Sequence, residues 1–140
     1  MEGRVLAVDP GSRRVGLALS DESRRLASPL RTLEAEPLAT LSERLAAVAR
    51  EVGAVELVVG LPRNLDGGSG SAAASARALA NELKISTRLP VTLLDERLSS
   101  VAAERHLVDQ GVRRARRKTL VDQLAATLIL ESFLQKKRHD

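Results

Sequence analysis

The sequence predicts an α/β fold in which one mixed five-stranded sheet is flanked by helices. The first 33 residues alternate short β-prone runs with turn residues, whereas the rest of the chain alternates helical periodicity with short apolar runs. At 140 residues the chain suits one domain, 1–140, with a core of its own and little room for a second module. We therefore expect three antiparallel N-terminal strands, then two parallel strands, and a single functional site.

The opening meander is expected from three runs. Residues 5–8 are apolar and β-prone, the Asp-Pro-Gly-Ser segment at 9–12 breaks the run, and residues 15–19 resume it. This pattern is typical of a hairpin. A third run, Leu26 to Leu33, holds Pro29 and suits an edge strand better than a central one.

The period then changes to that of a helix. Apolar residues recur at helical spacing from Pro37, which suits the first helical turn, to Gly53, which suits the stop. Residues 55–61 are apolar except for Glu56, as expected for a parallel strand covered on both faces. The remaining elements are expected at 71–83 (an Ala-rich helix), 91–94 (a buried strand), 99–111 (a helix capped by Ser99 or Ser100 and ended by Gly111) and 119–134 (a helix).

Composition excludes several kinds of chemistry. The chain has no Cys, so disulfides, thiolate zinc sites and a Cys nucleophile are ruled out, and Phe133 as the single aromatic residue leaves no platform for base stacking. A net charge of +4 favours a polyanionic partner, although a solvated surface would give the same charge. No apolar run is long enough to cross a bilayer, so we expect no membrane partner and a cytoplasmic location.

Acidic residues end two of the expected strands. Asp9 ends the first, and the pair Asp95 and Glu96 ends the last. Because successive strand residues point to opposite faces, only one of that pair can share a face with Asp9. Simpler roles remain open: Asp9 as a turn former, and an ion pair with Arg97 that holds the loop.

Asp122 completes the acidic set. In the last predicted helix it precedes Ala126 by one turn and Ile129 by two, so it lies on or beside the packed face. A helix-start carboxylate stabilised by the macrodipole is the simpler explanation. If the acids converged with the strand-end acids, they would repel one another unless a divalent cation neutralised them. Oxygen ligands select Mg²⁺ or Mn²⁺, which predicts phosphodiester hydrolysis.

Four ordered motifs resemble the YqgF family, also called RuvX, a branch of the RNase H-like superfamily. The resemblance covers nearly the whole chain, which makes it far more specific than any one motif. The motifs are Asp9, Gly11, Arg14, Gly16, Ser20 and Asp21; then Val59, Gly60, Leu61, Pro62, Asn64, Leu65, Asp66 and Gly67; then Asp95, Glu96, Arg97 and Leu98; and last Val121, Asp122, Gln123, Ala125 and Ala126.

The resemblance implies an RNase H-like fold and a metal-dependent nuclease, which we expect to process the 5′ end of the 16S rRNA precursor in ribosome biogenesis. The alternative it implies is a Holliday junction resolvase acting on DNA. By similarity, Asp9, Glu96 and Asp122 are the catalytic, metal-binding carboxylates for Mg²⁺ or Mn²⁺, and Asp95 is a substitute for Glu96. Two further sets would contact nucleic acid: Arg14, Asn64 and Arg97, and the basic run of Arg113, Arg114, Arg116, Arg117 and Lys118 before the last helix.

Two other readings remain. A protein that keeps the fold with a degraded site would bind nucleic acid without catalysis. An ATP-binding protein with a phosphate loop at Asp9, Gly11 and Ser12 would need two such domains, and this chain has one. The resolvase reading favours a symmetric homodimer.

Overall fold

The computed structural model describes residues 3–61, 71–95 and 114–139. They form one five-stranded sheet in the order β3-β2-β1-β4-β5, with β1, β2 and β3 antiparallel and β4 and β5 parallel to β1. The sheet predicted from the sequence is thereby confirmed. The strands are β1 (Arg4–Pro10), β2 (Arg14–Ser20), β3 (Ala27–Glu34), β4 (Ala54–Leu61) and β5 (Val91–Asp95).

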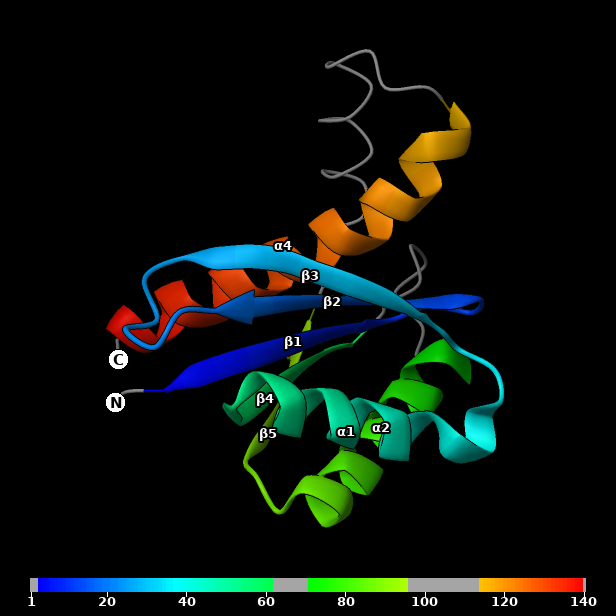
Figure 1. Cartoon of the computed structure of the whole chain (residues 1–140), viewed down its shortest axis with the longest axis horizontal. Helices are drawn as coiled ribbons and strands as arrows, with labels where there is room; N and C mark the ends of the chain where they lie inside the picture. Colours follow the sequence, from blue (N-terminus) through cyan, green and yellow to red (C-terminus); the bar gives the residue numbers. More distant parts are fainter. Residues whose placement is uncertain (1–2, 62–70, 96–113, 140) are drawn as a thin grey trace.

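Helices cover both faces of the sheet (Figure 1). The helices α1 (Leu41–Val52) and α2 (Ser71–Thr87) pack against each other on one face, and α4 (Arg114–His139) covers the other. The helix α4 runs from the end of the sheet where β1 finishes toward the end where β1 starts, and its first half projects beyond the strands (Figure 1). In the described ranges, no helix is long and apolar enough to span a membrane.

Strand alternation divides the core into two layers. In β1, Leu6 and Val8 pack with α1 and α2, whereas Val5 and Ala7 pack with α4. Both layers are closed to solvent, because these four side chains are fully buried. Residues 5–8 of β1 are therefore all apolar, because one face of the strand packs against α1 and α2 and the other against α4. We call the two sides of the sheet the α1/α2 face and the α4 face.

Helix starts differ from the sequence prediction, whereas one helix stop agrees with it. Pro37 precedes a short 3₁₀ turn at Leu38–Thr40 and so lies outside the first α-helical turn. Gly53 ends α1 in the left-handed conformation, with φ 71°, as expected of glycine after a helix. The predicted helix over 99–111 lies outside the described residues.

The helix α4 is longer than predicted. It begins at Arg114 instead of 119, so Arg114, Arg116, Arg117 and Lys118 lie within its first turns and do not precede it. The physical reason is that Arg, Lys and Ala all favour helix, and no Gly or Pro interrupts the segment. Arg113 lies outside the described residues.

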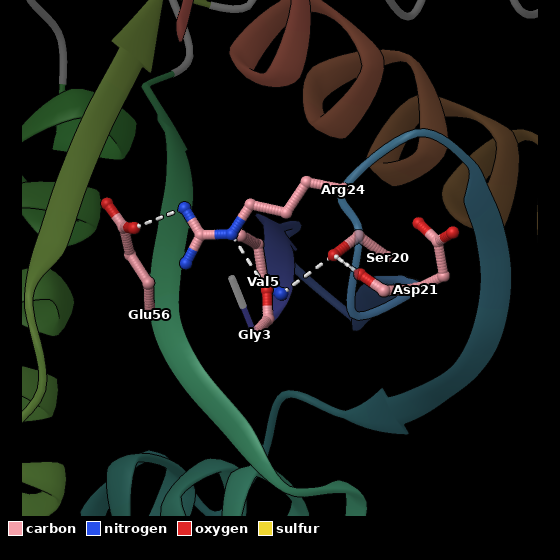
Figure 2. A network of polar contacts seen from close by, with 6 residues as sticks. All are labelled: Gly3, Val5, Ser20, Asp21, Arg24 and Glu56. Atoms are coloured by element: carbon pink, nitrogen blue, oxygen red, sulfur yellow. Dashed lines mark hydrogen bonds and ion pairs between the residues drawn. The ribbon is translucent and has the colours of Figure 1, made fainter. Parts of the chain in front are cut away.

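A polar network closes the end of the sheet where β1 starts (Figure 2). The Arg24 guanidinium donates from Nη1 to Glu56 Oε1 at 2.9 Å and from Nε to the Gly3 carbonyl at 2.7 Å. The Val5 N–H donates to the Ser20 hydroxyl at 2.8 Å. The buried Glu56, the one polar residue predicted inside β4, is therefore explained by its ion pair with Arg24.

Candidate functional site

Asp9 is a nearly buried carboxylate at the opposite end of the sheet from that network. It is the penultimate residue of β1, pairs with Gly16 of β2 and is 9% exposed. By alternation it shares a face with Val5 and Ala7, which pack against α4. Asp9 therefore lies on the α4 face, among the few polar residues that the sheet buries.

Glycines flank Asp9 on both neighbouring strands. Gly16 of β2 lies directly opposite it, and Gly60 of β4 follows the last paired residues, Val8 and Val59. Neither glycine carries a side chain that would crowd the carboxylate. At these two positions the neighbouring strands therefore present only backbone to Asp9.

Asp95 ends β5 on the other face. Val91 packs in the α1/α2 layer and Leu94 packs against the α4 layer, so Asp95, the residue after Leu94, belongs to the α1/α2 face. It is exposed and pairs with Leu61 of β4. Asp9 and Asp95 therefore do not share a face, and Glu96 lies outside the described residues.

The helix α4 carries the third predicted carboxylate. Ala126 is fully buried in the α4 layer with Ala7 and Ala18 of the sheet, and Ile129 is 1% exposed. Small residues on both sides let helix and strands approach closely. Position 122 is one helical turn before Ala126, in the backbone that the structure describes; the Asp122 side chain lies outside the description.

A tight turn joins Asp9 to β2. The Gly11 N–H donates to the Arg14 carbonyl at 3.0 Å. A Cβ at position 11 would lie 2.5 Å from that oxygen, so a side chain here would force the backbone to move. Arg14, predicted to contact phosphate, starts β2 and is partly buried.

The described residues hold part of the predicted site. Among them, no three His, Cys, Asp or Glu residues come together to hold a metal. Asp9 is the described member of the predicted metal set, and its oxygens are the hard donors that Mg²⁺ and Mn²⁺ take. Asn64 and Arg97, both predicted to contact nucleic acid, lie outside the described residues, as do the side chains of the basic residues in the first turns of α4.

Sequence reasoning missed two arginines near the turn. Arg13 is exposed at its tip, and its carbonyl accepts the Ala35 N–H at 2.8 Å. Arg44 of α1 donates to three carbonyl groups at and just after the end of β3, those of Glu34, Ala35 and Pro37. Nothing in the local pattern separates these two from other arginines, because their roles depend on contacts between distant segments.

The comparisons with known proteins decide the family. A family model described as "RuvX: Holliday junction resolvase" matches residues 3–136. The chain belongs to this family. Its relatives include a protein of Roseiflexus sp. (strain RS-1) that bears the name "Putative pre-16S rRNA nuclease". The two are 41% identical over 136 residues, which cover 97% of this chain and 96% of the relative.

A relative of the same name from Mycolicibacterium paratuberculosis is 44% identical, over 97% of this chain and 82% of its own. These identities confirm the family that the four motifs indicated. The match to the RuvX family therefore extends over nearly the whole chain.

Solved structures share the fold at low sequence identity. Thermus thermophilus RuvC, in complex with a Holliday junction substrate, superposes with a TM-score of 0.62 at 17% identity and covers 97% of this chain and 96% of its own. The fowlpox virus Holliday junction resolvase gives a TM-score of 0.57 at 11% identity, over 95% and 99% of the two chains. The RNase H-like fold of this RuvX member is thereby confirmed.

Proposed function

We propose that this RuvX member is a metal-dependent nuclease that hydrolyses phosphodiester bonds in RNA. The observation that carries the proposal is Asp9: a nearly buried carboxylate at the end of a central strand, on the face that α4 covers. The central strand fixes the position of this carboxylate, and its oxygens are the hard donors that Mg²⁺ and Mn²⁺ take. We propose that a divalent metal ion binds there.

Glu96 and Asp122 are proposed as the other two metal-binding carboxylates. Leu94 is on the α4 face and Asp95 on the α1/α2 face, so continued alternation would return residue 96 to the face of Asp9. Position 122 belongs to the same helical stripe as the buried Ala126. The alternation favours Glu96 over Asp95, and the three proposed carboxylates would then lie on one face of the sheet.

Mg²⁺ or Mn²⁺ bound by these carboxylates would activate a water molecule and stabilise the leaving oxygen of the phosphodiester. The chain's own contribution is to hold Asp9 at a strand end and to fix the start of β2, at Arg14, through the Gly11 turn. The basic first turns of α4 lie at the same end of the sheet (Figure 1). We propose that they bind the phosphate backbone, from which condensed counterions are then released.

RNA is proposed as the substrate because of the names that the curated relatives bear, and the reaction would be 5′ processing of the 16S rRNA precursor. The description of the RuvX family supports a second candidate, cleavage of four-way DNA junctions. A junction has two symmetric strands to cut, so this candidate would require a homodimer. Either substrate would place the protein in the cytoplasm.

One assay separates the candidates. The purified protein with Mn²⁺, and separately with Mg²⁺, is offered a 5′-extended 16S precursor RNA and a synthetic four-way DNA junction under identical conditions. We expect cleavage of the RNA that stops when EDTA is added. Exclusive, structure-specific cutting of the junction would show that the substrate is DNA instead of RNA. Binding of either nucleic acid without cleavage would show a non-catalytic nucleic-acid-binding protein.

A further inference from the structure

We propose that Arg13 binds the phosphate backbone of the nucleic acid substrate beside Asp9. The inference rests on the proposed function and extends it to a residue outside the predicted site. Arg13 is exposed at the tip of the turn between β1 and β2, and its side chain makes no hydrogen bond or ion pair in the described ranges. It is thus a cation available to a ligand.

The turn that carries Arg13 is held from both sides. Within the turn, the Gly11 N–H donates to the Arg14 carbonyl at 3.0 Å, and Gly11 has no space for a side chain. From outside, the Arg13 carbonyl accepts the N–H of Ala35, a residue 1% exposed in the α1/α2 layer. A backbone fixed at both points presents the side chain from a defined place.

Arg44 in turn fixes the segment around Ala35, whose N–H binds the Arg13 carbonyl. Its guanidinium donates to the carbonyls of Glu34 at 2.7 Å, Ala35 at 3.2 Å and Pro37 at 2.9 Å, and to the Thr40 hydroxyl at 3.1 Å. Through Arg44, the helix α1 therefore fixes residues 34–37, and Ala35 of this segment fixes the turn between β1 and β2. These hydrogen bonds fix the backbone of Arg13. A fixed backbone matters for an arginine that binds a ligand at one place, because it positions the guanidinium before the ligand arrives.

The position of the turn selects the ligand. Arg13 extends from the end of the hairpin where Asp9 lies, and the basic first turns of α4 begin at the same end of the sheet (Figure 1). A polyanion that reached Asp9 would therefore meet basic residues of the turn and of α4 at the same end of the sheet. A guanidinium binds phosphate oxygens through two parallel donors, so a phosphodiester backbone is the ligand that fits.

The test compares Arg13→Gln, Arg13→Lys and the matched control Arg50→Gln. Arg50 is an exposed arginine in the last turn of α1, which leads into the start of β4, so its loss changes the net charge equally but at the far end of the sheet. Binding to a single-stranded 16S precursor RNA and to a four-way DNA junction is measured by fluorescence anisotropy in EDTA over a series of KCl concentrations. Cleavage is measured separately with Mn²⁺.

We expect Arg13→Gln to raise Kd about three- to tenfold at low salt. It should also reduce the slope of log K against log salt by about 0.7 for the RNA and about 0.9 for duplex arms. Arg13→Lys should restore the slope, Arg50→Gln should match the wild-type protein, and cleavage at saturating substrate should be unchanged in all three.

A Kd and slope for Arg13→Gln equal to those of Arg50→Gln would overturn the inference. So would an unchanged Kd with slower cleavage at saturation, which would point to a role in the reaction itself. If the wild-type protein bound both nucleic acids and cleaved neither, the proposed nuclease function would fail while the binding comparison still decided the role of Arg13. A wild-type protein that bound neither would overturn both.

Discussion

At the scale of single residues, Asp21 holds together the connection between β2 and β3. Its carboxylate accepts the Ser23 hydroxyl at 2.7 Å, the Arg25 N–H at 2.8 Å and the Leu26 N–H at 3.0 Å. The hydrogen bond from Ser23, followed by the one from Leu26, lowers the pKa of Asp21 to about 2. An Asp in such a turn satisfies backbone donors that the strands leave unpaired.

The lowered pKa of Asp21 gives stability a pH dependence. Because the folded pKa is below the ordinary value of 3.8, the contribution of the carboxylate is present above that value and is lost as pH falls toward about 2. Asp21→Asn should therefore remove part of the decline in the unfolding temperature between pH 4 and pH 2. Thermal unfolding followed by circular dichroism across this range checks it, and identical pH profiles for the two proteins would contradict it.

At the scale of elements, the Arg24–Glu56 pair fastens the β2–β3 connection to β4. Figure 2 shows the contact between the two side chains, which are almost buried, at 11% and 9% exposure. Arg24 adopts a left-handed backbone conformation with φ 61°. That conformation is unfavourable for a residue with a side chain, so the ion pair and the bond to Gly3 have to offset it. Removing one partner would leave the other charge buried.

Glu56→Ala is expected to lower the free energy of unfolding by about 3 to 5 kcal/mol. The measurement is urea unfolding at neutral pH. The control is Glu51→Ala, which breaks the exposed Arg31–Glu51 pair at 2.7 Å and should leave the midpoint almost unchanged. Equal effects for the two variants would show that burial does not decide the role of the pair.

Packing between α4 and the sheet depends on small side chains. Ala126 is fully buried against a sheet surface that includes Ala7 and Ala18. Ala126→Leu adds volume to a closed layer and should cost about 1 to 3 kcal/mol of unfolding free energy. It should also displace the helix that carries Asp122 and slow cleavage.

The matched control for this change is Ala72→Leu, on the exposed side of α2. The larger side chain would extend into solvent and would not crowd the core, so stability and cleavage should stay close to those of the wild-type protein. Denaturant unfolding and cleavage rates of both variants are compared. A stable Ala126→Leu protein with full activity would contradict the close approach of α4 to the sheet.

At the scale of the whole molecule, periodicity predicted the sheet because β1 and β4 are apolar runs bounded by strong turn signals. Helix starts were less predictable, since α4 begins with basic residues that are good helix formers but carry no capping signal. The ion-pair partner of Glu56 could not be predicted from the sequence either. Its partner Arg24 is remote in the sequence, and only the folded chain brings the two together.

The candidate site was predicted in the same uneven way. Asp9 was found because a carboxylate follows an apolar strand, and the structure confirms that it is nearly buried on the face that α4 covers. The sequence left Asp95 and Glu96 as alternatives because it does not give the direction of the strand pleat. The packing of Leu94 gives that direction as far as Asp95, and Glu96 stays a proposal. Arg13 was missed because its anchoring depends on Ala35, a contact between segments that no local pattern contains.

The central claim is that a metal-dependent nuclease site is built on the α4 face, and one set of cleavage assays tests it directly. Asp9→Asn, Glu96→Gln, Asp122→Asn and the control Asp95→Asn are assayed with Mn²⁺ on the precursor RNA and the four-way junction, with folding checked by circular dichroism. We expect the first three to fold, to bind nucleic acid and to lose cleavage, whereas Asp95→Asn, on the opposite face, keeps it. Full activity in Asp9→Asn and Asp122→Asn would contradict the account.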